Sequence, residues 1–413
     1  MLHTRAMPQS PGKLVFVNRF FDPDESATSL LLTDLARGLA DASLTVHVVC
    51  SRQLYTNPRA GLQRHETLHG VTIHRLPTTR YGRAGLLGRS LDYATFYLSA
   101  VWMLLVHLKR GDVVVSKTDP PLICIPAALC ARLKGARLVN WQQDVFPEIA
   151  TTLAASPLPH WLDAVLRRLR DWSMRSATAN VLIGQRMLEY FEQRGIPPTK
   201  LQVIENWADG DVIAPKPAEA SALRTALGLQ EKFVVCYSGN LGRAHEFETL
   251  VAAAERLRQE PAIAFLIIGG GARMEPLRQA VTARALKNFI FLPYQPRVEL
   301  EDSLAAADVH LASLLPPLEG LLMPSKLYAV MAAGRPLIFI GDADGEIARV
   351  LREAECGITV AVDAGEDLVS AIRLLRREPQ LRSAMGARAR ACFLARYARG
   401  QALERWKAVV LHA

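Results

Sequence analysis

FVVCYSGNLGRAHEFETLVAAAERLRQEPAIAFLIIGGG, residues 233–271, is the stretch that says most about the fold. It opens with an apolar run in 233–240, continues through a glycine-containing turn into a helical pattern over 246–259, and closes with a second apolar run over 264–271. Two apolar strands joined by one helix are typical of a parallel βαβ unit. This stretch therefore predicts a parallel sheet covered by helices.

The same alternation extends outward in both directions. Downstream, we expect strands over 288–294, 308–314 and 336–341, with helices over 274–285, 299–306 and 344–354 and one from Ser325. Upstream, we expect strands over 13–18, 46–51, 112–115, 136–141, 180–184 and 201–206, a first helix that includes Leu30 to Leu39, and another over 185–193. This order predicts an α/β protein built from two doubly wound, Rossmann-like domains that face each other across a cleft.

Chain length supports two domains. The protein has 413 residues and a mass of 45.5 kDa, about twice what one hydrophobic core usually organises. A polar, proline-containing stretch over 208–217 suits a linker. We therefore expect an N-terminal domain over 1–207, a C-terminal domain over 208–385, and a long amphipathic helix over 386–413 that could pack across either domain.

Composition excludes several protein classes. Half of the residues are apolar and 22% are charged, which argues against a disordered chain and a coiled coil. Lys and Arg number 49 against 40 Asp and Glu, and the net charge of +9 favours anionic partners. No basic strand with interleaved aromatic residues and no helix-turn-helix pattern is present, so we do not expect a nucleic-acid partner.

The six cysteines are scattered, without a C-x-x-C pair or histidines at zinc spacing. They indicate buried thiols in a reducing compartment, and we expect no metal site. The apolar segment 14–17 is too short for the core of a secretory signal. We therefore expect a cytoplasmic protein, with peripheral attachment to the inner face of the cell membrane as an open alternative.

A candidate phosphate-binding turn follows the strand 233–240. Gly239 and Gly242 let backbone amides turn toward an anion, and Arg243 can add a bidentate contact to a phosphate. An ordinary strand-to-helix turn with a solvated arginine is the alternative. The pattern G-x-G-x-x-G is absent, which disfavours nicotinamide chemistry. Residues 269–271, three glycines, indicate either a flexible turn or close approach of the backbone to a ligand.

A second candidate segment, PPLEGLLMPSKLYAVMAAGRP, covers residues 316–336. Glu319 and Gly320 precede Pro324, which suits the first turn of a helix, and Ser325 and Lys326 place a hydroxyl and an ammonium at its positive end. We interpret this arrangement as a pyrophosphate-binding site. A purely structural capped helix would explain the proline and the alanines, but not the convergence of Glu, Ser and Lys.

Here the sequence resembles the retaining, nucleotide-sugar-dependent glycosyltransferases of family four, which have the GT-B fold. The matching segments are FFDPDESATSLLLTDLARGLA (20–40), NWQQDVFPE (140–148), VIENWAD (203–209), YSGNLGR (237–243), IIGGG (267–271), FLPYQP (291–296), AAADVHLASL (305–314) and EGLLMPSKLYAVMAAGRP (319–336). The subgroup that the chain most resembles builds bacterial surface polysaccharides. Its members add sugars from nucleotide diphosphate sugars to lipid-linked saccharides at the cytoplasmic membrane face.

The resemblance implies roles for individual residues. Glu319 would be the first glutamate of the family's two-glutamate motif and lie against the donor sugar, while Arg243 and Lys326 would hold the diphosphate. The remaining donor-site residues would be Gly239, Asn240, Gly242, Gly270, Tyr294, Gln295, Gly320 and Ser325, with Pro293 to Gln295 beside the base. The second glutamate is missing, because Leu327 or Ala329 stands at its place. Asn240 and His245 replace the family's usual basic pair.

In a retaining transfer, negative charge accumulates on the departing diphosphate, and fixed cations and amides stabilise it. The family's expected mechanism lets the leaving phosphate accept the acceptor proton, so we expect neither a catalytic metal nor a cofactor. Asp144 follows a predicted strand and completes the predicted catalytic set of Glu319, Arg243, Lys326 and Asp144. It either orients the acceptor hydroxyl or the donor sugar, or caps the next helix.

One apolar helix and one basic, aromatic helix raise the question of a membrane. The stretch 93–108 is apolar but shorter than the roughly 20 residues of a membrane span, and 160–172 combines Trp and Leu with Arg. Such helices suit an anionic lipid surface. Packing of the first helix on the sheet, with solvated arginines nearby, is the alternative.

Two other functions remain open from the sequence. The missing second glutamate is compatible with a non-catalytic component of a membrane polysaccharide assembly complex. A sugar-nucleotide epimerase would share the fold, but it needs acid and base side chains on both faces of the sugar, and we identify no such set.

Overall fold

A computed structural model gives the structure of the chain and describes residues 12–412 apart from 83–84 and 154–158. The chain divides into two compact units. Unit 1 runs to Glu205 and includes the residues from Ala402 onward, and unit 2 covers Asn206–Gln401.

Unit 1 contains an eight-stranded sheet in the order β3-β4-β2-β1-β5-β6-β7-β8. The strands are β1 (Leu14–Val17), β2 (Val46–Ser51), β3 (His65–Leu68), β4 (Val71–Leu76), β5 (Val113–Ser116), β6 (Arg137–Gln142), β7 (Ala179–Leu182) and β8 (Leu201–Val203). All neighbouring strands pair in parallel except β3 and β4, which are antiparallel. The strand order reverses between β1 and β5.

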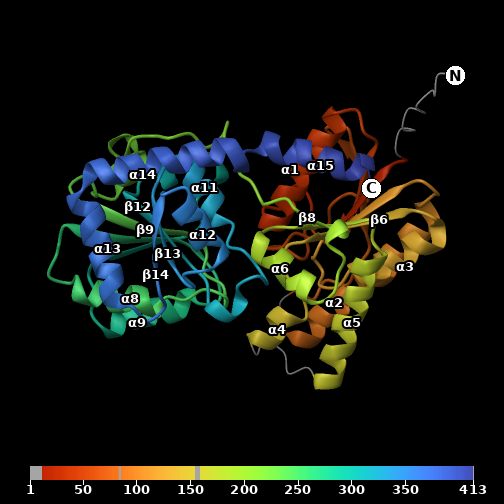
Figure 1. The fold of residues 1–413 in the computed structure, drawn as a ribbon, viewed down its shortest axis with the longest axis horizontal. Helices are drawn as coiled ribbons and strands as arrows, with labels where there is room; N and C mark the ends of the chain where they lie inside the picture. Colours follow the sequence, from red (N-terminus) through yellow and green to blue (C-terminus); the bar gives the residue numbers. More distant parts are fainter. Residues whose placement is uncertain (1–11, 83–84, 154–158, 413) are drawn as a thin grey trace. The chain divides into compact units, whose positions relative to one another are not determined.

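Helices cover both faces of this sheet. They are α1 (Ala27–Asp41), α2 (Leu86–His107), α3 (Cys124–Lys134), α4 (Glu148–Thr152), α5 (His160–Ser176), α6 (Gln185–Gln193) and α15 (Arg399–His412). Figure 1 shows α1 and α15 on one face and α2 and α5 on the other. On the first face, Trp141 of β6 packs against Trp406 of α15 with 4.7 Å between ring centroids. On the second, Phe96, Ala100 and Leu104 of α2 are buried in the core.

Unit 2 contains a six-stranded, fully parallel sheet in the order β11-β10-β9-β12-β13-β14. Its strands are β9 (Phe233–Asn240), β10 (Ile263–Gly270), β11 (Phe289–Leu292), β12 (Val309–Ser313), β13 (Leu337–Ile340) and β14 (Gly357–Val360). The strand order reverses between β9 and β12. This is the strand order of the doubly wound dinucleotide-binding fold.

The alternation of side chains along β9 builds two cores in unit 2. Val235 and Tyr237 face one core, while Val234 and Cys236 face the other. The helices are α7 (Ala222–Ala226), α8 (Glu248–Arg256), α9 (Met274–Ala283), α10 (Leu300–Ala305), α11 (Lys326–Ala332), α12 (Glu346–Glu353), α13 (Gly365–Arg377) and α14 (Pro379–Cys392). Figure 1 shows α8 and α9 on one face of the sheet and α11 and α14 on the other.

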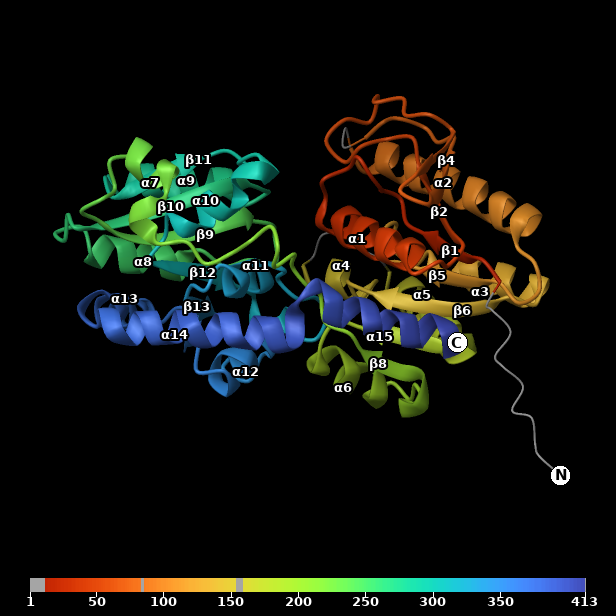
Figure 2. The ribbon, with the colours of Figure 1, turned by 90° about the horizontal axis from the view of Figure 1, so that it is seen from above.

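The predicted α/β class with two parallel sheets is confirmed, but the prediction of one helix over 386–413 is wrong. Helix α14 ends at Cys392, a π-helical turn covers Phe393–Tyr397, and Ala398 is extended before α15 begins. Phe393 and Tyr397 are buried, so packing of the two aromatic side chains accompanies the break. Figure 2 shows α14 in unit 2 and α15 beside the sheet of unit 1.

Two further findings concern the state of the cysteines and the length of the apolar helices. All six cysteines are free, and all but Cys392 are buried. Within the described part of the chain, no helix combines the length and the hydropathy that a membrane span requires.

Candidate active site

The carboxyl edge of the sheet in unit 2 is the first candidate site. Open parallel sheets bind ligands beyond the carboxyl ends of their strands, where the strand order reverses. In unit 2 this point lies between β9, which ends at Asn240, and β12, which ends at Ser313. The two segments singled out by the sequence, 237–245 and 316–336, both adjoin it.

The glycines at the ends of β9 and β10 allow these strands to approach closely. A Cβ atom on Gly269 would lie 2.3 Å from the carbonyl oxygen of Gly239, and one on Gly271 would lie 2.4 Å from that of Leu241. Both glycines have φ near +125°, a backbone conformation that other residues rarely adopt. Gly269 and Gly271 are therefore required for contact between backbone segments of the protein, a role that neither of the two sequence-based interpretations included.

Lys326, the first residue of α11, reaches the turn after β9. Its Nζ donates a hydrogen bond of 2.9 Å to the carbonyl oxygen of Asn240 and lies 4.6 Å from the centroid of the Tyr237 ring. A Cβ atom on Gly239 would lie 3.2 Å from Cε of Lys326, so the glycine leaves room for the side chain. Burial lowers the pKa of Lys326 to about 7. Among the described residues, no carboxylate forms an ion pair with it.

Arg243 and His245 lie in the same turn and differ in charge. Arg243 is exposed, and no hydrogen bond or ion pair of its side chain is found within the described ranges. His245 is buried, with Nδ1 2.6 Å from the carbonyl oxygen of Ser313. Burial, with the nearby Lys326 charge, lowers the pKa of His245 to about 3, so the imidazole is neutral. The turn thus offers an anion the free guanidinium of Arg243, while His245 ties the turn to β12.

Glu319 is held by the start of another helix. One carboxylate oxygen accepts a 3.2 Å hydrogen bond from the backbone amide of Glu346, the first residue of α12. A Cβ atom on Gly345 would lie 2.3 Å from the other oxygen, so a glycine is needed beside the carboxylate. Gly320 follows with a φ of +74° and is buried. The carboxylate of Glu319 therefore has a fixed position at the start of α12.

The remaining predicted donor-site residues surround the same edge. Tyr294 is 59% exposed and lies over Gly270, where a Cβ atom would be 3.1 Å from the tyrosine ring. The amide of Gln295 donates a 2.9 Å hydrogen bond to the carbonyl oxygen of Pro293. Ser325 occupies the N-cap position of α11, is exposed, and makes no capping hydrogen bond through its side chain.

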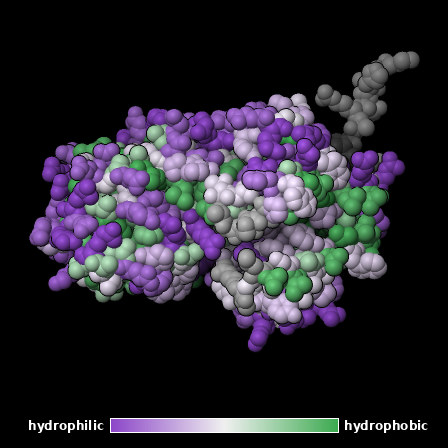
Figure 3. All heavy atoms as spheres, turned by 90° about the horizontal axis from the view of Figure 1, so that it is seen from below, coloured by the Kyte–Doolittle hydropathy of each residue, from purple (hydrophilic) through white to green (hydrophobic). Residues whose placement is uncertain are grey.

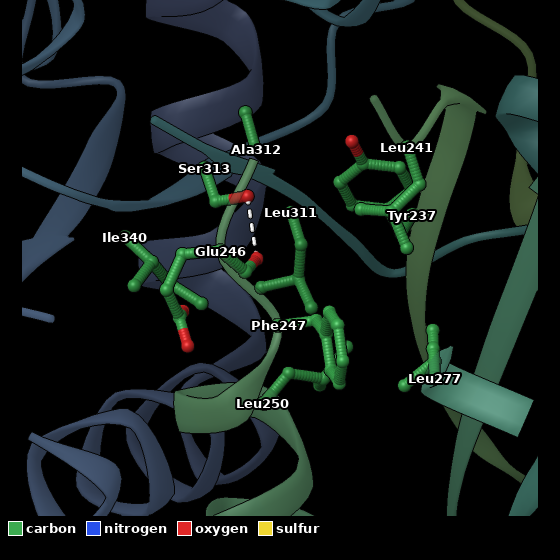
Figure 4. A pocket seen from close by; sticks show the side chains of 10 residues that line it. All are labelled: Tyr237, Leu241, Glu246, Phe247, Leu250, Leu277, Leu311, Ala312, Ser313 and Ile340. Carbon is green, nitrogen blue, oxygen red and sulfur yellow. Dashed lines mark hydrogen bonds between the residues drawn. The ribbon is translucent and has the colours of Figure 1, made fainter. Parts of the chain in front are cut away.

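A small cavity lies in the core below this edge (Figure 4). Its volume is about 10 Å³, the space of roughly one water molecule. Ser313 donates a 2.7 Å hydrogen bond to the carbonyl oxygen of Glu246, and the carboxylate of Glu246 accepts a 2.6 Å bond from the amide of Thr249. Burial raises the pKa of Glu246 to about 7. This cavity is too small for a sugar or a nucleotide.

The carboxyl edge of the sheet in unit 1 carries a different set of groups. Lys117 follows β5, is buried, and donates a 2.7 Å hydrogen bond from Nζ to the carbonyl oxygen of Thr28. The same Nζ lies 3.7 Å from the centroid of the Trp141 ring. Burial lowers the pKa of Lys117 well below its usual range, although the charges of Asp144 and Asp119 oppose the shift.

Two carboxylates accompany this lysine. Burial raises the pKa of Asp119 to about 6 and that of Asp144 to about 6, and for Asp144 the charge of Asp119 contributes to the rise. No side-chain hydrogen bond of either carboxylate is found within the part of the chain that the structure describes. The alternative reading of Asp144 as a helix cap is wrong, since α4 begins at Glu148 with Pro147 at its N-cap.

Sequence reasoning missed Lys117 and Asp119. The signal was present, because KTDPP follows directly on the buried strand β5 and places a lysine and an aspartate at its carboxyl end. Polar residues in that position belong to the edge of the sheet where ligands bind.

Comparison with known proteins agrees with this architecture. A family model described as a glycosyl transferase 4-like domain matches residues 30–207, and one described as glycosyl transferases group 1 matches residues 203–391. The probable glycosyltransferase WbjE of Pseudomonas aeruginosa is 30% identical over 67% of this chain and 69% of its own. The putative colanic acid biosynthesis glycosyl transferase WcaI of Escherichia coli K12 is 27% identical over 86% of this chain and 89% of its own.

Among solved structures, HepE of Anabaena in complex with UDP matches with a TM-score of 0.72. The match covers 97% of this chain and 99% of HepE at 15% identity, and it shows a shared fold. Two parallel-sheet α/β units, two family models that together span most of the chain, and a relative at 30% identity agree. The chain therefore belongs to the family of glycosyltransferases with the two-domain GT-B fold.

Proposed function

We propose that this glycosyltransferase moves a sugar from a nucleotide diphosphate sugar to a lipid-linked saccharide, with retention of the anomeric configuration, during surface polysaccharide synthesis. The single observation that carries the proposal is the position of Lys326. Its ammonium group has no carboxylate partner among the described residues and reaches the turn that also carries Arg243. An anion that binds there meets the guanidinium of Arg243 and the backbone amides of a glycine-rich turn, and its negative charge raises the pKa of Lys326 and holds that side chain as an ammonium.

A nucleoside diphosphate is the anion that we propose for this edge. HepE, which shares the fold, has been crystallised with UDP and with UDP-glucose. Tyr294 is an exposed aromatic ring beside the ends of β10 and β11 and is a suitable surface for the base. We propose a UDP-sugar as the first donor to test, with Glu319 directed toward the sugar.

The chemistry follows from where charge develops. The bond between the anomeric carbon and the β-phosphate oxygen breaks, and the acceptor oxygen forms a bond to the same face of that carbon. The departing diphosphate gains negative charge and accepts the acceptor proton. Lys326 and Arg243 stabilise that charge, and removing one such donor commonly costs on the order of 3 kcal/mol of transition-state stabilisation. We propose that these cations supply the neutralisation without a metal ion.

Unit 1 would serve the acceptor. Asp119 and Asp144 have carboxylates without hydrogen-bond partners within the described ranges, beside the buried Lys117. Carboxylates accept hydrogen bonds from hydroxyl groups, so the pair suits a sugar hydroxyl rather than a phosphate. We propose that Asp144 orients the acceptor hydroxyl and that Asp119 supports it.

The names of the related proteins support a polysaccharide as the product. WcaI is named for the biosynthesis of colanic acid, and it matches most of the present chain. We therefore propose an acceptor from surface polysaccharide assembly, carried on a lipid.

A panel of nucleotide sugars, each incubated with membrane extract as the source of acceptor, tests the proposal. We expect one donor to release nucleoside diphosphate in an acceptor-dependent way, and proton NMR of the product to show the donor's anomeric configuration. Conversion of the donor sugar without diphosphate release would instead identify an epimerase. Binding of UDP without turnover of any donor would favour a non-catalytic component of an assembly complex.

A further inference from the structure

Helix α2 has an exposed face that is almost entirely apolar. The face that packs on the sheet contains Phe96, Ala100 and Leu104, which are buried. The opposite face exposes Leu87, Leu91, Leu98, Trp102 and Val106, with Leu98 73% and Trp102 72% exposed. No charged residue stands between Asp92 and His107. A surface helix of a globular protein ordinarily has polar residues on its outer face, so this face needs an explanation.

The two neighbouring helices continue this pattern. Helix α3 packs beside α2 and exposes Leu129 and Leu133, which are one helical turn apart. Helix α5 packs beside α3 and exposes Trp161, Val165 and Leu169 at intervals of four residues. We call the ten exposed side chains of α2, α3 and α5 the apolar surface of unit 1. Figure 3 shows apolar side chains gathered over unit 1.

The apolar surface is concentrated rather than scattered. It holds more than half of the large apolar side chains that are exposed among the described residues. In unit 2 such side chains, for example Val298 and Tyr294, occur singly or in pairs on separate elements. Single exposed apolar residues are normal, whereas contiguous groups of this kind mark docking surfaces.

Cations without partners adjoin the surface. Lys109 and Arg110 follow α2, and Arg132 and Lys134 lie in the last turn of α3. These two helix ends meet, because a Cβ atom on Gly135 would lie 3.4 Å from Cγ of Arg110. None of the four cations forms an ion pair with another described residue.

The acidic side chains of the same region are already neutralised. Asp112 lies 3.6 Å from the ammonium of Lys13, and Asp163 pairs with Arg167 at 2.6 Å. The rim of the apolar surface therefore carries an excess of positive charge.

We propose that the apolar surface of unit 1 docks on an anionic lipid bilayer, with Lys109, Arg110, Arg132 and Lys134 among the headgroups. The positive charge of these four side chains favours a lipid bilayer over a second copy of the chain. A second copy of this chain would bring the same cations to the contact and repel them, whereas anionic phosphates would pair with them. Exposed Trp and Leu side chains beside cations are typical of surfaces that lie at the level of the headgroups. The proposal is independent of the transfer reaction, since it uses no donor-site or acceptor-site residue.

Co-sedimentation with vesicles tests the docking directly. The full chain is mixed with phosphatidylcholine vesicles that contain or lack phosphatidylglycerol, without nucleotide or saccharide. We expect binding to the anionic vesicles and weakening by added salt, since salt screens exposed charges. The double variant Leu98→Ser, Trp102→Ser should bind at least tenfold more weakly, because two apolar side chains no longer enter the lipid. Arg110→Gln should weaken binding about fivefold.

Matched controls separate docking from unfolding and from self-association. Val298→Ser in unit 2 replaces a side chain that is 91% exposed and should leave vesicle binding unchanged. Thermal melts confirm that each variant is folded. Absence of vesicle binding by the unaltered chain, or equal binding by the Leu98/Trp102 variant, would overturn the proposal. A dimer in light scattering that disappears in that variant, without vesicle binding, would assign the surface to a second copy instead.

Discussion

The carboxyl edges of the two sheets share a geometry and differ in chemistry. In unit 2, Lys326 and Arg243 have no carboxylate partner among the described residues, and His245 is buried and neutral. In unit 1, Lys117 lies beside two carboxylates, Asp119 and Asp144, and donates its hydrogen bond to a backbone carbonyl. The first edge suits an anion and the second suits hydroxyl groups. We propose that the two edges serve the donor and the acceptor of one transfer reaction, and that the side chains at the strand ends decide which.

The largest expected effect comes from removing the cations of unit 2. Lys326→Ala or Arg243→Ala should lower turnover by about a hundredfold or more, because the charge of the leaving diphosphate loses a fixed partner. Steady-state release of nucleoside diphosphate measures the change. Lys232→Ala is a matched control, since that lysine is bonded to the carbonyl oxygen of Pro261 on another part of unit 2. Near-normal rates in both cation variants would remove unit 2 as the anion site.

A smaller effect is expected from the carboxylates of unit 1. Asp144→Asn should lower turnover by about ten- to a hundredfold while UDP binding stays unchanged, since this residue is proposed to act on the acceptor. The pKa values of Asp119 and Asp144, both raised to about 6, place the loss of their charge just below neutral pH. Turnover of the unaltered enzyme should therefore fall between pH 7 and pH 5.

The variant Asp119→Asn distinguishes the contribution of Asp119 from that of Asp144. Without the negative charge of Asp119, the pKa of Asp144 should fall, and the acidic limb of the pH–rate profile should move to lower pH. Turnover measured from pH 5 to pH 8 for both variants gives the comparison. A profile that is identical in all three proteins would show that neither carboxylate titrates in the reaction.

The smallest expected effect is on the pH dependence of folding stability, which buried histidines in both units should produce. In unit 1, His74 contacts His47 and His65 at 3.0 and 3.2 Å between ring nitrogens, and burial lowers the pKa of His74 to about 4. In unit 2, burial lowers the pKa of His310 to about 4. Between about pH 6.5 and 4 these histidines are protonated in the unfolded chain but remain neutral in the folded chain. The free energy of unfolding should therefore fall as the pH falls.

Urea denaturation at pH 7.5 and pH 5 measures this loss. His74→Gln should reduce the pH dependence, because glutamine does not titrate, while the matched variant His69→Gln changes a histidine outside the cluster. Equal pH dependence in the unaltered chain and in His74→Gln would show that the cluster does not govern acid sensitivity.

Much of the fold could be predicted because buried parallel strands are continuous apolar runs. Residues 233–240 form the predicted strand without a shift, and α6 covers the predicted 185–193. The antiparallel pair β3 and β4 was missed, since His, Glu, Thr and Arg interrupt its apolar pattern at the sheet edge. The strand β14 was missed as well, because GITV contains only two large apolar residues and begins with a glycine.

The candidate site was predictable to the extent that local sequence determines it. The sequence singled out both the turn after β9 and the start of α11 as candidate phosphate-binding segments, and the hydrogen bond from Lys326 to Asn240 joins the two segments. The buried state of Lys117 and the histidine contacts around His74 join elements far apart in the chain, and no spacing in the sequence indicates them. The hydrogen bond between Glu319 and the first backbone amide of α12 likewise depends on tertiary packing.

The central claim is that unit 2 recognises the diphosphate through Lys326. Titration calorimetry with UDP and with UMP, on the unaltered protein and on Lys326→Ala, tests it most directly. We predict that the unaltered protein prefers UDP and that the variant loses about ten- to a hundredfold of this preference, the usual worth of a charge-assisted hydrogen bond. An equal preference for UDP over UMP in both proteins would contradict the claim.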